Sequence, residues 1–169
     1  MKRLKLEDIV NELELISDEG NSFLNKTTGE LLHISHKEFE HIKAGLKNDT
    51  FKKVWTVEKS FDPRKIFRNK NYIQLPTRSE INEYGVMMKF LLDISDERIH
   101  NEVYNSMNGN GGGSTALIDI MTKYNVDDEW YKYKRRAFRQ IAIDWCKNNF
   151  DSIPVRLQNE IAVNKYDKY

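Results

Sequence analysis

The chain lacks the features that mark an exported, membrane-spanning or strongly charged protein. Its 169 residues include a single cysteine, Cys146, so no internal disulfide can form. The first residues hold no uninterrupted apolar stretch like that of a signal peptide, and no run is long and apolar enough to span a bilayer. The 27 basic and 26 acidic residues nearly cancel. These absences predict a cytoplasmic protein without a membrane partner, in which any charged partner is met by a local patch.

What the chain does contain is enough material for one core. Apolar residues make up 39% of it, with eight Phe, eight Tyr and three Trp. There is no internal repeat and no linker long enough to divide the chain. We therefore predict a single globular domain over residues 1–150. Residues 151–169 are expected to form a C-terminal extension, with a short helix starting near Pro154 and then a frayed end.

Residues 127–149 predict the central helix around which the rest is organised. At about 100° per residue, the large apolar side chains of this stretch fall on one broad face. This face holds Trp130, Ala137, Phe138, Ile141 and Trp145. Three acidic residues at 127–129 supply an N-cap and a negative first turn, which the helix dipole favours. No glycine or proline interrupts the run.

Before this helix, the pattern predicts a first helix over residues 5–16 and a β-hairpin with strands at 22–25 and 30–34. Gly29 can take the positive φ that the hairpin loop requires. A helix over 36–47 follows, residues 50–71 stay open, and Tyr72–Leu75 predict a strand that ends at Pro76.

Three further helices are predicted before residue 127. A capping box of Thr77 and Glu80 starts a helix that runs to about Asp93. Its expected buried face holds Ile81, Tyr84, Met88, Leu91 and Leu92. The next helix, capped at 95–97, carries Ile99, Val103 and Met107, and Ser114 or Thr115 is expected to cap a short one. The fold class is thus α+β: a mainly helical domain with an N-terminal hairpin and one further short strand.

The block from Trp130 to Asn149, with Trp130-Tyr131-Lys132-Tyr133-Lys134 and Trp145-Cys146, resembles a bacterial group, uncharacterised protein family 0158. The hairpin segment Thr28-Gly29-Glu30 and the segment Tyr72–Pro76 followed by Glu80-Ile81 are similar to other blocks of that family, in the same order. The likeness covers residues 4–150. One departure is the run Gly112–Asp119, which lacks two arginines and a lysine that the family tends to carry. The family has no established activity, so the resemblance implies a fold and no reaction.

The first candidate site is the glycine-rich loop, with Gly111, Gly112, Gly113, Ser114 and Thr115. Backbone N–H groups that precede a helix can bind a phosphate, so this loop is a candidate anion-binding site. A phosphate-binding P-loop, however, follows a strand and places lysine before the Ser/Thr, whereas the segment before this loop is predicted to be helical. A plain connection between two helices is the favoured interpretation.

The second candidate is the basic face of the 127–149 helix, formed by Lys132, Arg135, Arg136 and Arg139. Three interpretations are open: a solvated face or one paired with carboxylates of the first helix, a face for an acidic protein partner, and a face for nucleic-acid phosphates. The first has the highest prior because a long helix must present polar groups to water.

Metal and cofactor sites are not expected. His33, His36, Glu38 and His41 are spaced so that at most two ligands converge, which is too few for zinc. Cys146 has no sequence signal for a neighbouring base, so a packed thiol is favoured over a nucleophile.

Lys134 is the anomaly of the apolar face. It lies between Trp130 and Phe138, where an ammonium group needs either a route to water, which is the favoured interpretation, or a carboxylate from another helix.

The sequence favours a small cytoplasmic, non-catalytic binding or regulatory protein that acts through a protein partner, and the basic face would suit an acidic one. The alternatives are a nucleic-acid-associated factor that uses the basic face, and an enzyme or ligand-binder whose polar groups converge only in three dimensions. An enzyme would show a pocket with perturbed acids or histidines, and a binding protein an exposed apolar or charged patch.

Overall fold

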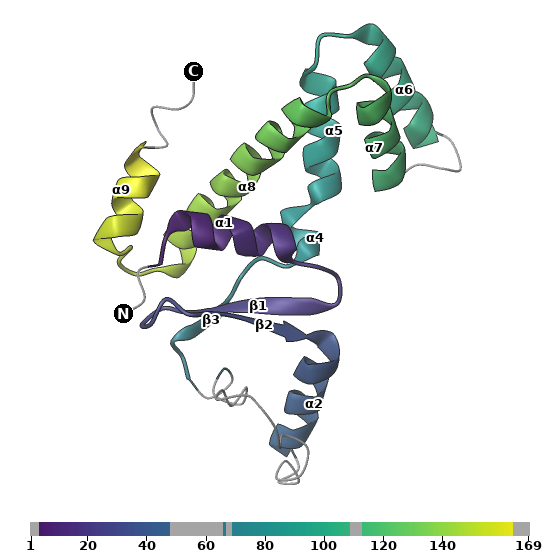
Figure 1. The fold of residues 1–169 in the computed structure, drawn as a ribbon. Helices are drawn as coiled ribbons and strands as arrows, with labels where there is room; N and C mark the ends of the chain where they lie inside the picture. Colours follow the sequence, from purple (N-terminus) through teal and green to yellow (C-terminus); the bar gives the residue numbers. More distant parts are fainter. Residues whose placement is uncertain (1–3, 48–65, 67–68, 109–112, 164–169) are drawn as a thin grey trace. The chain divides into compact units, whose positions relative to one another are not determined.

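The computed structural model describes residues 4–47, 66, 69–108 and 113–163. Over these residues the chain has the mainly helical α+β fold that the sequence predicts, with one three-stranded antiparallel sheet (Figure 1). It divides into two compact units: unit 1 comprises Met1–Thr77 and Ala142–Tyr169, and unit 2 comprises Arg78–Ile141. The domain boundary predicted at residue 150 stays a prediction. The open region 50–71 falls largely outside the described residues.

The sheet of unit 1 is built on the predicted hairpin. Strands β1 (Gly20–Asn25) and β2 (Leu31–Ser35) pair antiparallel, and β3 (Tyr72–Gln74) pairs on the other side of β1. Gly29 has φ 72°, and the side-chain oxygen of Asn25 accepts hydrogen bonds from the backbone N–H groups of Thr27 and Thr28. Both features satisfy the tight loop, because glycine tolerates positive φ and an Asx turn binds backbone donors.

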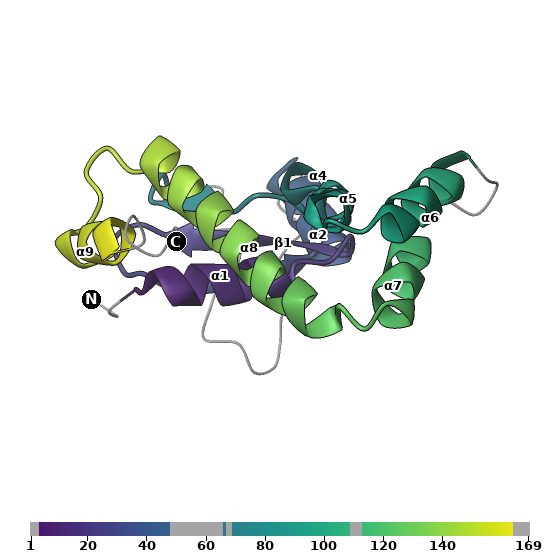
Figure 2. The ribbon, with the colours of Figure 1, turned by 90° about the horizontal axis from the view of Figure 1, so that it is seen from above.

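Helices cover both faces of this sheet. Helix α1 (Leu6–Leu15) lies on one face and helix α2 (His36–Lys47) on the other, as Figure 1 shows; Figure 2 shows α1 from above. Between α2 and the sheet, Phe23, Ile34 and Ile66 form a buried cluster. Helix α9 (Val155–Val163) packs on α1, where the carboxylate of Glu160 accepts a hydrogen bond from the backbone N–H of Leu6.

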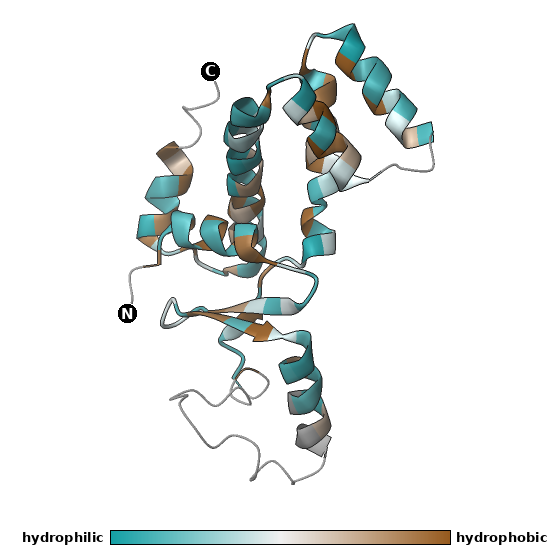
Figure 3. Cartoon of the chain, turned by 45° about the vertical axis from the view of Figure 1, so that its right-hand side comes forward, coloured by the Kyte–Doolittle hydropathy of each residue, from teal (hydrophilic) through white to brown (hydrophobic). Residues whose placement is uncertain are grey.

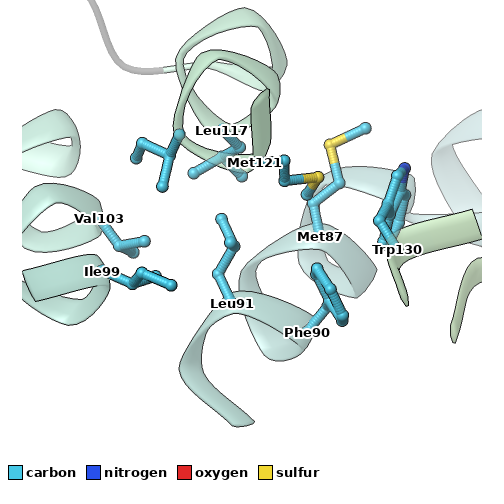
Figure 4. Close-up of a cluster of buried hydrophobic side chains, with 9 residues drawn as sticks. Met87, Phe90, Leu91, Ile99, Val103, Leu117, Met121 and Trp130 are labelled. Atoms are coloured by element: carbon cyan, nitrogen blue, oxygen red, sulfur yellow. The ribbon is translucent and has the colours of Figure 1, made fainter. Parts of the chain in front are cut away.

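Unit 2 is helical. It contains α4 (Arg78–Ile81), α5 (Glu83–Asp93), α6 (Glu97–Asn108), α7 (Ser114–Lys123) and the first 15 residues of α8 (Asp127–Asn149). The inward side chains of α5, α6, α7 and α8 form one core cluster, of which eight are labelled in Figure 4: Met87, Phe90, Leu91, Ile99, Val103, Leu117, Met121 and Trp130. In Figure 3 the ribbon of α5 is largely brown, the colour of apolar residues.

The prediction of one unbroken helix from Thr77 to Asp93 was wrong, because the helix is interrupted at one residue. Asn82 has φ 50° and ends α4, and its side-chain oxygen then accepts a hydrogen bond from the backbone N–H of Gly85, which caps α5. Asparagine is among the few residues that adopt the left-handed conformation readily. Three side chains expected on buried faces, Tyr84, Leu92 and Met107, are also exposed.

Helix α8 has the bounds that the sequence predicts, and Trp130 and Trp145 are 7% and 8% exposed. Its two halves bury different sides. Ile143 and Cys146, which follow Arg139 by four and seven residues and so lie on the same side of the helix, are buried. The basic face therefore ends at Arg139.

Candidate interaction face on helix α8

The predicted basic face lies on the part of α8 that belongs to unit 2. Lys132, Arg135 and Arg136 are exposed, and Arg139 is half-buried. Lys132 and Arg136 are four residues apart, so their side chains are neighbours on the helix surface, and Arg135 follows Lys132 by three residues. The structure thus brings three of the four predicted cations together on an exposed patch.

The four cations differ in their surroundings. Arg135 and Arg139 already interact within the chain. By contrast, neither Lys132 nor Arg136 forms an ion pair with any residue in the described part of the chain. The two cations most available to a partner are therefore Lys132 and Arg136.

Aromatic packing on the inner side of α8 orients this face outward. The ring of Phe90 on α5 lies 5.6 Å from that of Trp130 and 5.2 Å from that of Tyr133, centroid to centroid. The hydroxyl of Tyr133 donates to the Asp93 carboxylate over 3.3 Å. Burial of the ring, together with the nearby Asp93 carboxylate, raises the pKa of Tyr133. These contacts fix the rotation of α8 within unit 2, because large rings tolerate little displacement.

Lys134 adopts the second of the two predicted arrangements. Its ammonium group pairs with the carboxylate of Glu83 at the start of α5, and lies 5.1 Å from the centroid of the Phe138 ring. The pair is internal to unit 2 and directs this cation away from the Lys132 side of the helix. Lys134 is therefore not part of the basic face.

The structure describes only part of the glycine-rich loop. Gly111 and Gly112 lie outside the described residues, while Gly113 is the N-cap of α7 with extended backbone and no side-chain cap. Ser114, predicted as a possible cap, is instead the first residue of the helix, and Ser114 and Thr115 are exposed. The loop follows α6, a helix, as the sequence predicts. Anion binding at this loop stays a prediction.

The histidines do not converge. His33 lies on β2, and His36 and His41 are exposed on α2. Glu38 instead forms a capping box with Ser35. The Glu38 carboxylate accepts a hydrogen bond from the backbone N–H of Ser35, and the Ser35 hydroxyl accepts one from the backbone N–H of Glu38. Among the residues that the structure describes, no three His, Cys, Asp or Glu side chains are grouped to hold a metal ion.

A polar cluster that sequence reasoning missed joins α1 to the sheet. The hydroxyl of Ser22 donates to the Glu12 carboxylate over 2.6 Å and lies 3.1 Å from Nδ1 of His33, which is directly opposite Ser22 in the β1–β2 register. Ser22 is 1% exposed and lies between the other two groups, so it cannot act as a nucleophile with His33 as its base. The cluster holds α1 on the sheet. The predicted pairing of the two hairpin strands was the only feature of the sequence that pointed to this cluster.

A second missed cluster joins α6 to α7. The Glu102 carboxylate accepts hydrogen bonds from Nζ of Lys123 over 2.5 Å and from the hydroxyl of Tyr124 over 2.8 Å. The bond from Lys123, followed by that from Tyr124, lowers the pKa of Glu102, and the same carboxylate raises the pKa of Tyr124. Each charge is matched within the cluster, so its arrangement supports the helix pair.

Cys146 is buried in unit 1, as the packed-thiol interpretation predicts. Burial raises its pKa to about 12, which keeps the thiol protonated at neutral pH. On the preceding residue, Nε1 of Trp145 donates to the backbone oxygen of Gln74 over 3.1 Å.

Comparison with known proteins adds no relative. No protein-family model, curated protein or solved structure matches the chain. The resemblance to uncharacterised protein family 0158 therefore stays a prediction. Among the described residues, no helix combines the length and the apolar character needed to cross a bilayer.

Proposed function

We propose that this protein is a small, non-catalytic binding or regulatory protein that acts through an acidic protein partner. The observation that carries the proposal is the pair Lys132 and Arg136, two neighbouring exposed cations without an ion pair in the described part of the chain. Two unpaired cations on a helix held firmly from its inner side form a charged patch of fixed geometry. Complementary charges of this kind give a partner specificity and a faster encounter.

The cytoplasm is the proposed location. A buried, reduced thiol at Cys146 suits a reducing compartment. The chemistry of the clusters agrees with a binding role, because Glu12, Ser22 and Glu102 are occupied with contacts that hold helices in place.

The test compares two charge-reversed variants of the full chain, each used as bait in the cell that makes the protein. Lys132→Glu/Arg136→Glu changes the proposed face. The control is Lys37→Glu/Lys89→Glu, which reverses two exposed lysines on α2 and α5 and gives the same change in net charge. We expect mass spectrometry to find acidic proteins that bind the wild type and the control but not the first variant. An identical set of bound proteins for both variants contradicts the proposal, and so does recovery that depends on nucleic acid and is abolished by nuclease.

A further inference from the structure

An exposed aromatic ring lies beside the basic patch. Tyr131 is 68% exposed, and its neighbour on the helix surface is Arg135, four residues on. Arg135 also follows Lys132 by three residues, so it connects the tyrosine to the pair Lys132 and Arg136 on one exposed surface.

Tyr131 has no part in the core of unit 2. The other tyrosine of this turn, Tyr133, packs on Phe90 and binds Asp93, and no ring contact of Tyr131 is found within the described residues. An aromatic ring at this exposure is apolar surface whose burial by a ligand is favourable. Tyrosine is enriched where proteins bind one another, because it offers a large contact area at a low cost in conformational entropy.

Acidic residues border the patch on one side. Asp128 and Glu129 are exposed and precede Lys132 by four and three residues, which places both one turn away from it. A nucleic-acid backbone, with about one charge per 1.7 Å of duplex, would bring phosphates against these carboxylates. A protein segment can instead place its carboxylates only where the cations lie. The mixed signs on this surface therefore favour a protein ligand over a nucleic acid.

We infer that the ligand of this face is an acidic protein segment that also carries an aromatic side chain. That side chain packs on Tyr131, while the carboxylates of the segment bind Lys132 and Arg136. The inference rests on the proposed function and adds the chemistry of the partner to it.

Two defined polymers test the inference with the full chain: polyglutamate, and a random copolymer of glutamate and tyrosine of the same length. Binding is measured by calorimetry at about 50 mM salt, where screening is weak. We expect the copolymer to bind roughly three- to tenfold more tightly per site, the gain typical of one aromatic pair. Tyr131→Ser is expected to abolish that gain and to leave polyglutamate binding unchanged, whereas Lys132→Gln/Arg136→Gln weakens both.

The control is Tyr104→Ser, which removes another highly exposed tyrosine of unit 2, on α6, and is expected to leave both affinities unchanged. The inference is overturned if the copolymer gains nothing over polyglutamate, if Tyr131→Ser keeps the gain, or if Tyr104→Ser also abolishes it. Tighter binding of a short DNA duplex than of either polymer overturns it as well. Failure of both polymers to bind the wild type counts against the proposed function itself. A failure of the proposed function is thereby distinguished from a failure of the inference about the aromatic side chain.

Discussion

The ammonium group of Lys134 on α8 pairs with the carboxylate of Glu83 at the first turn of α5, and the two side chains are 21% and 22% exposed. The carboxylate also lies at the N-terminal end of α5, where the helix dipole favours negative charge. Removing one member of such a pair leaves the other partly desolvated without its partner, whereas replacing both with apolar groups leaves no uncompensated charge.

We predict that Lys134→Met lowers the free energy of unfolding by about 1–3 kcal/mol, less than for a fully buried pair because water still reaches both groups. The double variant Lys134→Met/Glu83→Leu should recover most of the loss. Urea denaturation of the two variants measures both quantities. Lys132→Met, an exposed lysine of the same helix, is the control and should change the stability by less than about 0.5 kcal/mol. A more stable Lys134→Met protein would contradict the need for this pair.

Part of the acid sensitivity should trace to Asp96. Hydrogen bonds from the side chain and then the backbone N–H of Arg98 lower the pKa of Asp96 from 3.8 to about 2. Because the folded pKa is the lower one, this carboxylate stabilises the fold fully above pH 4, and the contribution is lost as the pH falls from about 4 towards 2. Asp96→Asn keeps a capping oxygen and loses the charge.

We therefore expect the melting temperature of Asp96→Asn to fall less steeply than that of the wild type between pH 4 and pH 2, as followed by circular dichroism. Above pH 5 the variant should be the less stable of the two proteins. Asp119→Asn, an exposed acid on α7, is the comparison. Parallel curves for wild type and Asp96→Asn would show that another carboxylate governs this range.

The thiol of Cys146 should be unreactive in the folded protein. Its burial and its pKa of about 12 leave almost no thiolate at pH 8. We predict that a disulfide reagent such as DTNB labels it at a rate set by unfolding, and labels it within seconds in denaturant. Native labelling as fast as that of a small free thiol would rule out this burial.

The break at Asn82 should depend on both its backbone and its side chain. Asn82→Ala removes the oxygen that binds the N–H of Gly85 and puts alanine, which unlike asparagine rarely adopts the left-handed conformation, at φ 50°. We expect it to destabilise the protein by about 1–3 kcal/mol. Asn82→Gly loses only the cap and should cost clearly less. Thermal unfolding distinguishes the two, and equal losses would mean that the left-handed conformation contributes nothing.

The sequence predicts local features well where a short pattern decides them. The acidic residues at 127–129 and the absence of glycine and proline up to residue 149 predicted the bounds of α8 correctly, and Gly29 predicted the hairpin loop. The break at Asn82 was missed because Ile81 and Met88 have the spacing of one continuous helix, and periodicity carries no information on a single left-handed residue. Leu92 and Met107 were expected to be buried because spacing identifies a face, while the neighbours that cover it come from the tertiary structure.

The candidate site was predictable in position but not in detail. Helical geometry placed Lys132 and Arg136 on one side of α8, and both are exposed. It allowed for pairing of this face within the chain, as Arg135 and Arg139 show, but could not tell that Lys134 pairs with Glu83, because that contact joins residues distant in sequence. The Glu12–Ser22–His33 cluster was beyond reach for the same reason: it needs the strand register and the docking of α1.

Gly20 lies under the imidazole of His33, where an added Cβ would be 2.6 Å from Nε2 of that ring and 2.7 Å from the backbone oxygen of Ile34. The second contact is with main chain, which a change at position 33 cannot relieve. Homologues of this protein should therefore retain glycine at position 20 even where His33 is replaced by another residue. An alignment of homologues in which position 20 stays glycine independently of residue 33 would confirm this constraint.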